Sequence, residues 1–152
     1  MEIDRDDPLR DDVRALLEQH LRDMRANSPA CSIHALDPLA LAGPDVSFWT
    51  LRAEGALLGC AALRQIAADH GEIKSMRTTA AARRRGVAAR LLAHVLDEAR
   101  ARGYARVSLE TGAQGFFAPA RAFYGSRGFV ECGPFEGYGP DPNSVFMTLA
   151  LG

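Results

Sequence analysis

The chain has 152 residues, of which 47% are hydrophobic and 24% are charged, a composition typical of one folded domain. Its 18 basic and 19 acidic side chains leave a formal net charge of -1, which excludes the overall basic field that draws proteins to nucleic acids or membrane surfaces. We therefore expect a single domain over residues 1–152, with no nucleic acid and no membrane among its partners.

Hydrophobic periodicity, hairpin signals and helix-stop signals divide the chain into helices and strands. In chain order, the expected elements are strand 2–4, helices 9–26 and 36–41, strands 46–52, 56–66 and 72–78, helix 86–102, strand 105–110, helix 117–127, and strands 129–132 and 144–149. The helix over 86–102 is the clearest, because its apolar residues fall on one face and Gly103 follows it. This order predicts a mixed sheet flanked by helices, in the α/β or α+β class.

The cysteines and the first residues indicate where the protein works. Three cysteines at wide spacings, without a CxxC pair, are typical of free thiols in a reducing compartment. The acidic start MEIDRDDPLRDD differs from a secretory signal, and no stretch approaches the roughly 20 apolar residues of a membrane span. We therefore expect a cytoplasmic protein. The four histidines show no metal-ligand spacing, so no metal is expected.

The most specific feature is an arginine run with a glycine where a helix is expected to start, Arg83-Arg84-Arg85-Gly86-Val87-Ala88. A helix start presents unpaired backbone N–H groups and the positive end of a dipole. Cations placed there oppose the dipole by about 0.3–1 kcal/mol each, and a bound polyanion removes that conflict. The small residues Gly86 and Ala88 let an anion approach the backbone. The loop therefore predicts a pyrophosphate site, with a solvated arginine run as the alternative.

Two motifs in register resemble the GNAT superfamily of N-acetyltransferases. The signature [Q/R]-x-x-G-x-[G/A] of that family is matched by Arg83, Gly86 and Ala88. The signature A-x-x-x-Y-x-x-x-G-F is matched by Ala120, Tyr124, Gly128 and Phe129. The segments EIKSMRT, SLETG and CGPFEGYGPDPNSVFMT are similar to a bacterial branch of the family that is often labelled YsnE-like. The resemblance covers nearly the whole chain.

This resemblance implies a single-domain GNAT fold, with a mixed and mostly antiparallel sheet that splays between its fourth and fifth strands. The splay receives the pantetheine arm of acetyl-CoA, and backbone N–H groups at the start of the following helix hold the pyrophosphate. Cofactor contacts are therefore expected at Met76, Arg77, Thr78, Arg83, Arg84, Arg85, Gly86, Val87, Ala88, Ala89, Phe117 and Tyr124. Phe117 departs from the family pattern, because many members have an asparagine there. Either Gln114 replaces that contact or the contact is missing.

The resemblance also implies an enzyme that transfers the acetyl group of acetyl-CoA to a small amine by direct attack, without a covalent enzyme intermediate. The backbone N–H of Met76 is expected to polarise the thioester carbonyl, as in an oxyanion hole. Tyr124 stands where many members place the general acid, and tyrosine, with an ordinary pKa of about 10, is protonated at neutral pH.

The general base has three candidates. Glu72 matches the position of the glutamate base in the histone-acetyltransferase branch, and its alternative is a structural carboxylate paired with Lys74 or Arg77. Glu110, at the end of the strand expected over 105–110, is a rival, and a water relay is the third option. On a regular strand, one face is shared by Glu72, Lys74, Met76 and Thr78.

By the same resemblance, the proline-interrupted loop over 27–34 lies over the acceptor site. Ser28, His34 and Glu110 are therefore expected substrate contacts, and His20 is a further candidate, with local hydrogen bonding as the alternative for both histidines. Two other functions keep the same fold: transfer from a different acyl-CoA, and CoA binding by a sensor domain without catalysis. Family members are often dimers, so a homodimer is one option for the assembly.

Overall fold

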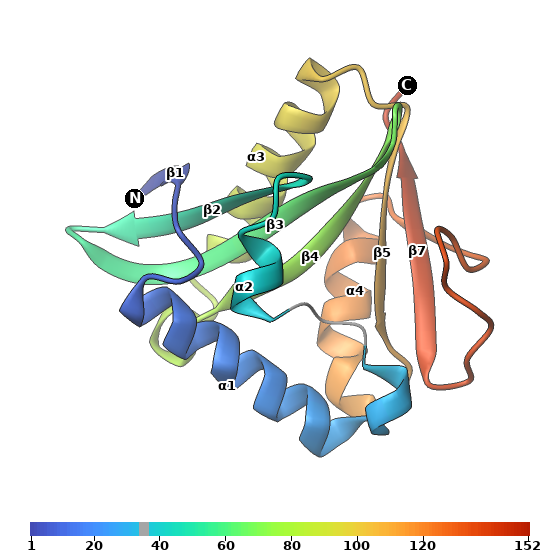
Figure 1. Ribbon diagram of the computed structural model, residues 1–152, viewed down its shortest axis with the longest axis horizontal. Coiled ribbons are helices and arrows are strands. Elements are labelled where there is room, and N and C mark those ends of the chain that lie inside the picture. The colour runs from blue at the N-terminus through green and yellow to red at the C-terminus, as the bar shows by residue number, and fades with distance from the viewer. Residues whose placement is uncertain (34–36) are drawn as a thin grey trace.

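The computed structural model describes residues 1–33 and 37–152, and within these residues the strands form one sheet with helices on both faces (Figure 1). The strands are β1 (Glu2–Arg5), β2 (Val46–Ala53), β3 (Ala56–Ala67), β4 (His70–Thr78), β5 (Arg106–Gly112), β6 (Val130–Cys132) and β7 (Ser144–Ala150). The helices are α1 (Asp11–Asn27), α2 (Pro38–Leu41), α3 (Val87–Ala101) and α4 (Ala118–Ser126). Short 3₁₀-helical turns are η1 (Ala30–Ser32), η2 (Ala80–Ala82) and η3 (Gly115–Phe117).

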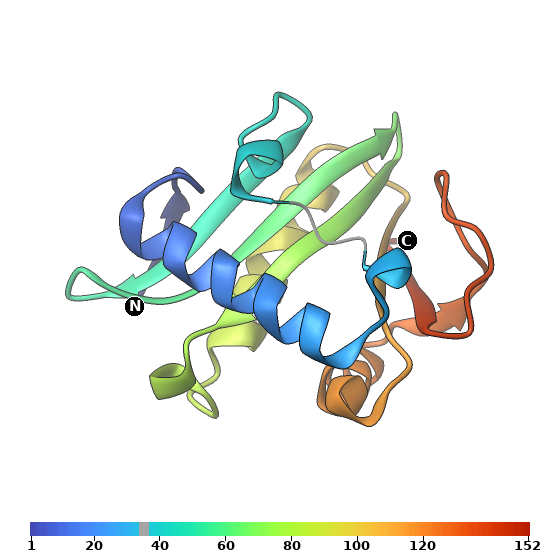
Figure 2. The ribbon, with the colours of Figure 1, turned by 60° about the horizontal axis from the view of Figure 1, so that its bottom comes forward.

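The sheet has the strand order β1-β2-β3-β4-β5-β7-β6. Strands β4 and β5 pair parallel, and the other neighbouring strands pair antiparallel. A parallel pair needs a crossover connection, which α3 provides. Helices α1 and α2 lie on one face of the sheet, and α3 and α4 lie on the other (Figure 1, Figure 2). The expected mixed, mostly antiparallel sheet flanked by helices is confirmed.

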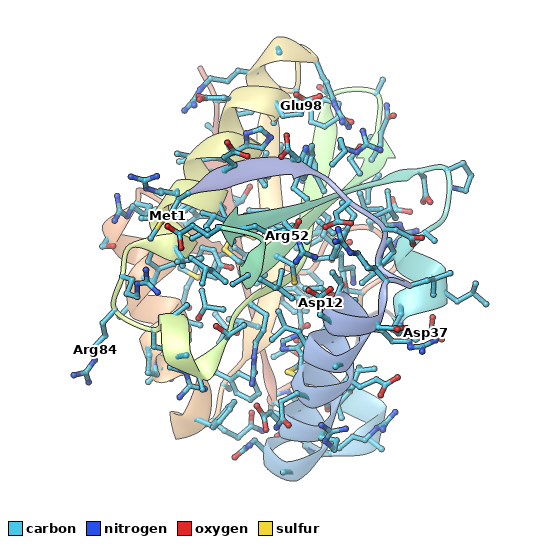
Figure 3. All side chains as sticks on the ribbon, turned by 90° about the vertical axis from the view of Figure 1, so that its left-hand side faces the viewer. Met1, Asp12, Asp37, Arg52, Arg84 and Glu98 are labelled. Atoms are coloured by element: carbon cyan, nitrogen blue, oxygen red, sulfur yellow. The ribbon has the colours of Figure 1, made fainter. Side chains whose placement is uncertain are left out.

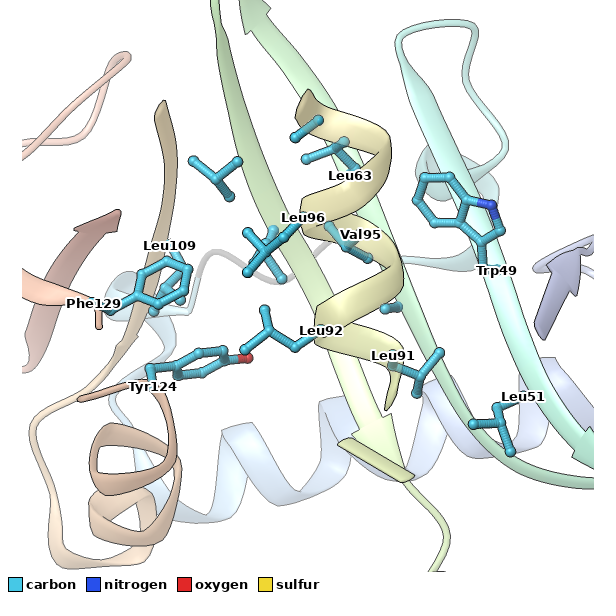
Figure 4. Packing of buried hydrophobic residues seen from close by; sticks show 14 of the residues in the cluster. Trp49, Leu51, Leu63, Leu91, Leu92, Val95, Leu96, Leu109, Tyr124 and Phe129 are labelled. Carbon is cyan, nitrogen blue, oxygen red and sulfur yellow. The ribbon is translucent and has the colours of Figure 1, made fainter. Parts of the chain in front are cut away.

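Helix α3 forms the larger core with the sheet. Its buried residues Leu91, Leu92, Val95 and Leu96 recur at helical spacing and point from the helix toward the neighbouring elements (Figure 4). The helix was expected over 86–102 and spans Val87–Ala101, because glycines with positive φ flank it on both sides. The smaller core lies on the opposite face, where α1 and α2 pack on β2 and β3. The helices on both faces therefore pack against the middle strands of the sheet.

Strands β4 and β5 separate partway along their length. They pair only at His70↔Arg106, Gly71↔Val107 and Glu72↔Ser108, although β4 continues to Thr78 and β5 to Gly112. Figure 1 shows the two strands close together near the C-terminus and diverging toward α1 and α4. The splay between the fourth and fifth strands is thereby confirmed, and among residues 1–33 and 37–152 it leaves one edge of β4 without a strand partner beyond Glu72.

A β-bulge at Ser75 corrects one expectation for β4. The pairing with β3 jumps from Ala62↔Lys74 to Cys60↔Arg77, and Ser75 has a φ of 53°. An extra residue in a strand inverts the alternation of its side chains. Lys74 therefore lies on the α1 face, as Glu72 does, whereas Met76 packs against the core on the α3 face. The prediction that Glu72, Lys74, Met76 and Thr78 share one face was wrong.

Candidate active site

A cavity of about 710 Å³ lies where β4 and β5 separate. Its walls are formed by the C-terminal half of α1, by β4 from Glu72 to Thr78, by β5 from Leu109 to Thr111, by the loop before α3 and by α4. Strand β4 therefore contributes to the cavity over most of its unpaired edge. The cavity runs from the start of α3 to the face covered by α1, so groups that the sequence places far apart meet in one space.

The arginine run lies at the end of the cavity next to α3. Arg83, Arg84 and Ala88 line the cavity, Val87 is buried in the core, and Arg84 extends away from the loop (Figure 3). Gly86 has a φ of 76°, a conformation that costs an L-residue about 1–2 kcal/mol, and a Cβ built on it would meet no atom within 4 Å. The glycine is therefore needed for its backbone conformation and not because a neighbour crowds it.

Tyr124 reaches the cavity from α4 and contacts β4. Its side chain is 8% exposed and packs edge-on against Phe123 and Phe129. Its hydroxyl donates to Sδ of Met76 at 3.4 Å, and burial raises the pKa of the phenol above its usual value. The phenol is thus protonated at neutral pH, and its partner is a weak acceptor. The structure brings Tyr124 and Met76, two expected site residues, together, and Tyr124 also belongs to the core (Figure 4).

Glu72 is held by a network that reaches the loop between β6 and β7. Its carboxylate is 1% exposed, and its Oε2 accepts from the Tyr138 hydroxyl at 2.5 Å. Lys74 Nζ lies 3.3 Å from the same oxygen and donates to the Tyr138 hydroxyl oxygen at 2.7 Å. Burial, followed by the charge of Glu72, raises the pKa of Tyr138. The pairing of Glu72 with Lys74, which the sequence offered as an alternative to the base role, is therefore present.

Glu110 lines the cavity from β5 and has an unusual proton affinity. Burial raises its pKa from 4.5 to about 7, although the nearby Ser144 hydroxyl and the charge of Lys74 act in the opposite direction. A carboxyl group with this pKa exists in both protonation states near neutral pH. It therefore has the proton affinity of an efficient general base at that pH.

The wall next to α1 contains residues that the sequence did not single out together. Arg77 forms an ion pair with Asp23, so its side chain lies on the α1 face and its expected contact with the cofactor is left to its backbone. Burial, together with the charge of Arg77, lowers the pKa of His20 to about 4, so this imidazole is neutral at physiological pH. Asp23 and Tyr138 were missed, because helical or loop position alone does not reveal a partner on a distant strand.

Four further residues that were named from the sequence have different outcomes. Phe117 is buried, lines the cavity and packs against Gly112, where a Cβ would lie 2.1 Å from its ring. Gln114 donates to Asn143 at 2.9 Å and accepts from Ser28 Oγ at 3.3 Å, so its amide is engaged outside the cavity lining. Ser28 thus joins the end of α1 to the segment that precedes α4. His34 lies outside the described residues.

Metal-ligand clusters and membrane-spanning helices are both absent from the described residues. Residues 1–33 and 37–152 contain no group of three or more His, Cys, Asp or Glu side chains that could hold a metal ion. In the same part of the chain, no helix combines the length and the apolar character needed to cross a membrane. The three cysteines are free thiols, and burial raises the pKa of Cys60 to about 12.

The chain matches the model of the acetyltransferase (GNAT) family over residues 13–129. It is 50% identical over 151 residues to the uncharacterized N-acetyltransferase YsnE of Bacillus subtilis, an alignment that spans 99% of this chain and 100% of that protein. The fold and these matches define an acyl-CoA-dependent N-acyltransferase. The chain belongs to the acetyltransferase (GNAT) family.

Two solved structures place the fold among acyltransferases. The structure of an acyl-CoA N-acyltransferase from Klebsiella pneumoniae has a TM-score of 0.81 at 26% identity, covering 99% of this chain and 97% of that chain. N-acetylglutamate synthase from Neisseria gonorrhoeae, solved with coenzyme A and N-acetyl-glutamate, has a TM-score of 0.72 at 24% identity and covers 99% of this chain and 35% of that chain. The second likeness is one of fold alone, and it shows that a domain of this architecture occurs in a protein that binds coenzyme A.

Proposed function

We propose that the protein transfers the acetyl group of acetyl-CoA to a small amine by direct attack of the amine on the thioester. The observation that carries this proposal is one continuous cavity with two chemically different ends. At one end lies the arginine-rich start of α3, which suits an anion. At the other end lies Glu110, whose pKa of about 7 suits proton removal from an amine. The arginine-rich end therefore suits a polyanionic donor, and the end with Glu110 suits a protonated acceptor.

The residues of the α3 end fit coenzyme A. The first turn of α3 presents backbone N–H groups without partners inside the helix, next to Arg83 and Arg84. Beyond Glu72, the edge of β4 that faces β5 has no strand partner in the part of the chain that the structure describes, so its backbone groups can pair with an extended chain that carries amides, as pantetheine does. We assign the cosubstrate to Met76, Arg77, Thr78, Arg83, Arg84, Arg85, Gly86, Val87, Ala88, Ala89, Phe117 and Tyr124.

We assign one residue to remove a proton from the amine and another to protonate the leaving thiolate. Acetyl-CoA supplies the activated acetyl group, and the C–N bond forms as the C–S bond breaks. Glu110 takes the proton from the amine nitrogen, and the backbone N–H of Met76 stabilises the negative charge that develops on the carbonyl oxygen. Tyr124 donates its phenolic proton to the thiolate sulfur. An acceptor that arrives as an ammonium first releases one proton to solvent. The neutral amine then loses its second proton to Glu110 as the thiolate gains one from Tyr124, and Glu110 returns its proton to Tyr124 through solvent.

Glu72 remains the alternative base, with a water relay as the third option. We favour Glu110, because one oxygen of Glu72 already interacts with both Tyr138 and Lys74. Ser28 and His34 stay as proposed acceptor contacts on the loop that follows α1. A cytoplasmic location agrees with the free thiols, and a homodimer stays a proposal for the assembly.

A thiol-release assay with a library of small amines tests the proposed function. Acetyl-CoA should support turnover with at least one amine and should be used more efficiently than longer acyl-CoA donors. Higher efficiency with a longer acyl-CoA would change the donor, and CoA binding without turnover of any amine would favour a sensor domain. The variants Glu110→Gln and Glu72→Gln separate the two bases. We expect a loss of kcat of roughly 10²-fold or more for Glu110→Gln and a smaller loss for Glu72→Gln.

A further inference from the structure

The bulge in β4 leaves Ser75 and Met76 without a paired residue on either neighbouring strand in the described part of the chain. On the β3 side, the register skips both residues where it passes the bulge, and on the β5 side the pairing ends at Glu72. Ser75 is 9% exposed, and both residues line the cavity. Buried backbone groups that a sheet does not pair need other hydrogen-bond partners.

The thiol of Cys60 is one such partner. Cys60 lies on β3, is fully buried in the core under α1, and its Sγ donates to the carbonyl oxygen of Ser75 at 3.3 Å. Burial raises the pKa of this thiol to about 12, so it keeps its proton and stays a donor at physiological pH. Ser75 has a φ of 53°, which is uncommon for a residue other than glycine. The hydrogen bond therefore fastens an unusual backbone conformation to the neighbouring strand.

The direction of this hydrogen bond determines the direction of the next N–H. The peptide bond between Ser75 and Met76 is trans, so its C=O and N–H point in opposite directions. The sheet order places β3 on one side of β4 and β5 on the other. Because the carbonyl of Ser75 turns toward a donor on β3, the N–H of Met76 turns toward β5, where the two strands have separated and the cavity lies.

We propose that Cys60 is a positioning residue, which holds the carbonyl of Ser75 and thereby orients the N–H of Met76 toward the thioester oxygen of acetyl-CoA. The inference rests on the proposed acetyl transfer and adds to it a residue outside the cavity lining. A donor of this kind stabilises the developing oxyanion because it is aligned before the reaction begins. A hydrogen bond to the carbonyl also polarises the peptide, which makes its N–H a better donor.

Infrared spectroscopy of acetyl-CoA with an isotopically labelled carbonyl tests the orientation directly. A stronger hydrogen bond to this carbonyl lowers its stretching frequency, so binding to the unchanged protein should lower it. In Cys60→Ala, the frequency should return at least halfway to that of free acetyl-CoA, while the affinity for acetyl-CoA changes little. Cys60→Ser keeps a donor and should retain the lowered frequency. A bound carbonyl with the same frequency in Cys60→Ala as in the unchanged protein would overturn the positioning role.

Steady-state kinetics of the same variants separate positioning from packing. Cys60→Ala should lower kcat about tenfold, which is part of the roughly 10²–10³-fold effect of a whole oxyanion donor, with the KM of acetyl-CoA little changed. Cys60→Ser should restore most of kcat. The control is Val46→Ala, which removes volume from the same core on β2, a strand that does not pair with β4. It should lower the melting temperature and leave kcat and the carbonyl frequency unchanged. Equal losses of kcat in Cys60→Ala and in either Cys60→Ser or Val46→Ala would overturn the inference.

A further variant and two further outcomes complete the test. If Cys60→Ala does not fold, Cys60→Val carries the same expectations, because it fills the site without a donor. A carbonyl frequency that binding to the unchanged protein does not lower would overturn the role of the Met76 N–H, and this inference with it, while acetyl transfer stands. Failure of every amine to release thiol would overturn the acetyltransferase proposal itself.

Discussion

At the scale of single residues, the environment of Tyr124 joins two roles. The ring packs among aromatic neighbours in the core, and the hydroxyl points to the thioether of Met76, which is a weak acceptor. A hydroxyl in that position loses only a weak hydrogen bond when it turns to another partner. The same side chain can therefore fill space and still supply a proton to the cavity.

Tyr124→Phe keeps the ring and removes only this hydroxyl. We expect kcat to fall more than tenfold, because general acid catalysis typically contributes roughly 10²–10⁴-fold. The affinity for CoA and the melting temperature should change little, because the lost hydrogen bond was weak. Steady-state kinetics, calorimetry and thermal unfolding measure the three quantities. Tyr104→Phe is the matched control, because Tyr104 is an equally buried phenol outside the cavity lining. A near-normal kcat for Tyr124→Phe would leave only a packing role.

At the scale of elements, the sequence predicted the features that depend on neighbouring residues alone. Helix α3 was expected to within a residue at each end, because apolar periodicity and flanking glycines specify it. The Ser75 bulge was missed, because nothing in Lys74-Ser75-Met76 resembles a turn signal and the bulge is visible only in the pairing with β3. Tyr138 could not be assigned a partner, because its contact with Glu72 joins residues 66 positions apart. The site residues within the sequence motifs could thus be predicted, whereas contacts between elements far apart in the sequence could not.

The glycines at the two ends of α3 allow a controlled test of the phosphate loop. Gly86 and Gly103 have φ values of 76° and 79°, and a Cβ on either would meet no atom within 4 Å. Gly86→Glu and Gly103→Glu should therefore destabilise the protein by a similar amount, about 1–2 kcal/mol. Only Gly86→Glu should weaken CoA binding, by at least tenfold or about 1.4 kcal/mol, because its carboxylate would repel the pyrophosphate. Calorimetry that found both variants binding CoA alike would place the cofactor elsewhere.

At the scale of the whole molecule, two buried groups in the cavity make stability depend on pH in opposite directions. The pKa of Glu110 rises from 4.5 to about 7, so the unfolded chain loses this proton first and stability falls as the pH rises through that window. The pKa of His20 falls from 6.5 to about 4, so the unfolded chain gains this proton first and stability falls as the pH drops through that window. The two windows overlap, and each group partly offsets the other.

Glu110→Gln isolates one of these contributions. At about pH 5 the native carboxyl is mostly protonated and resembles the amide, whereas at about pH 8 it is ionised and buried. The melting temperature of the variant, minus that of the unchanged protein, should therefore increase between these two pH values. Calorimetric scans across the range measure it, and Asp97→Asn, an exposed carboxylate on α3, is the control. A difference independent of pH would mean that Glu110 titrates normally.

The short pairing between β4 and β5 also has a mechanical meaning. Three residue pairs form the seam between the part of the sheet that carries α3 and the part that carries α4, and the seam lies at one end of both strands. Beyond the seam, side chains join the two parts, such as the hydrogen bonds from Ser28 to Gln114 and from Tyr124 to Met76. A ligand that touched both β4 and β5 in the cavity would add a further attachment between the two parts. We therefore expect the protein to be more rigid with its substrates bound than without them.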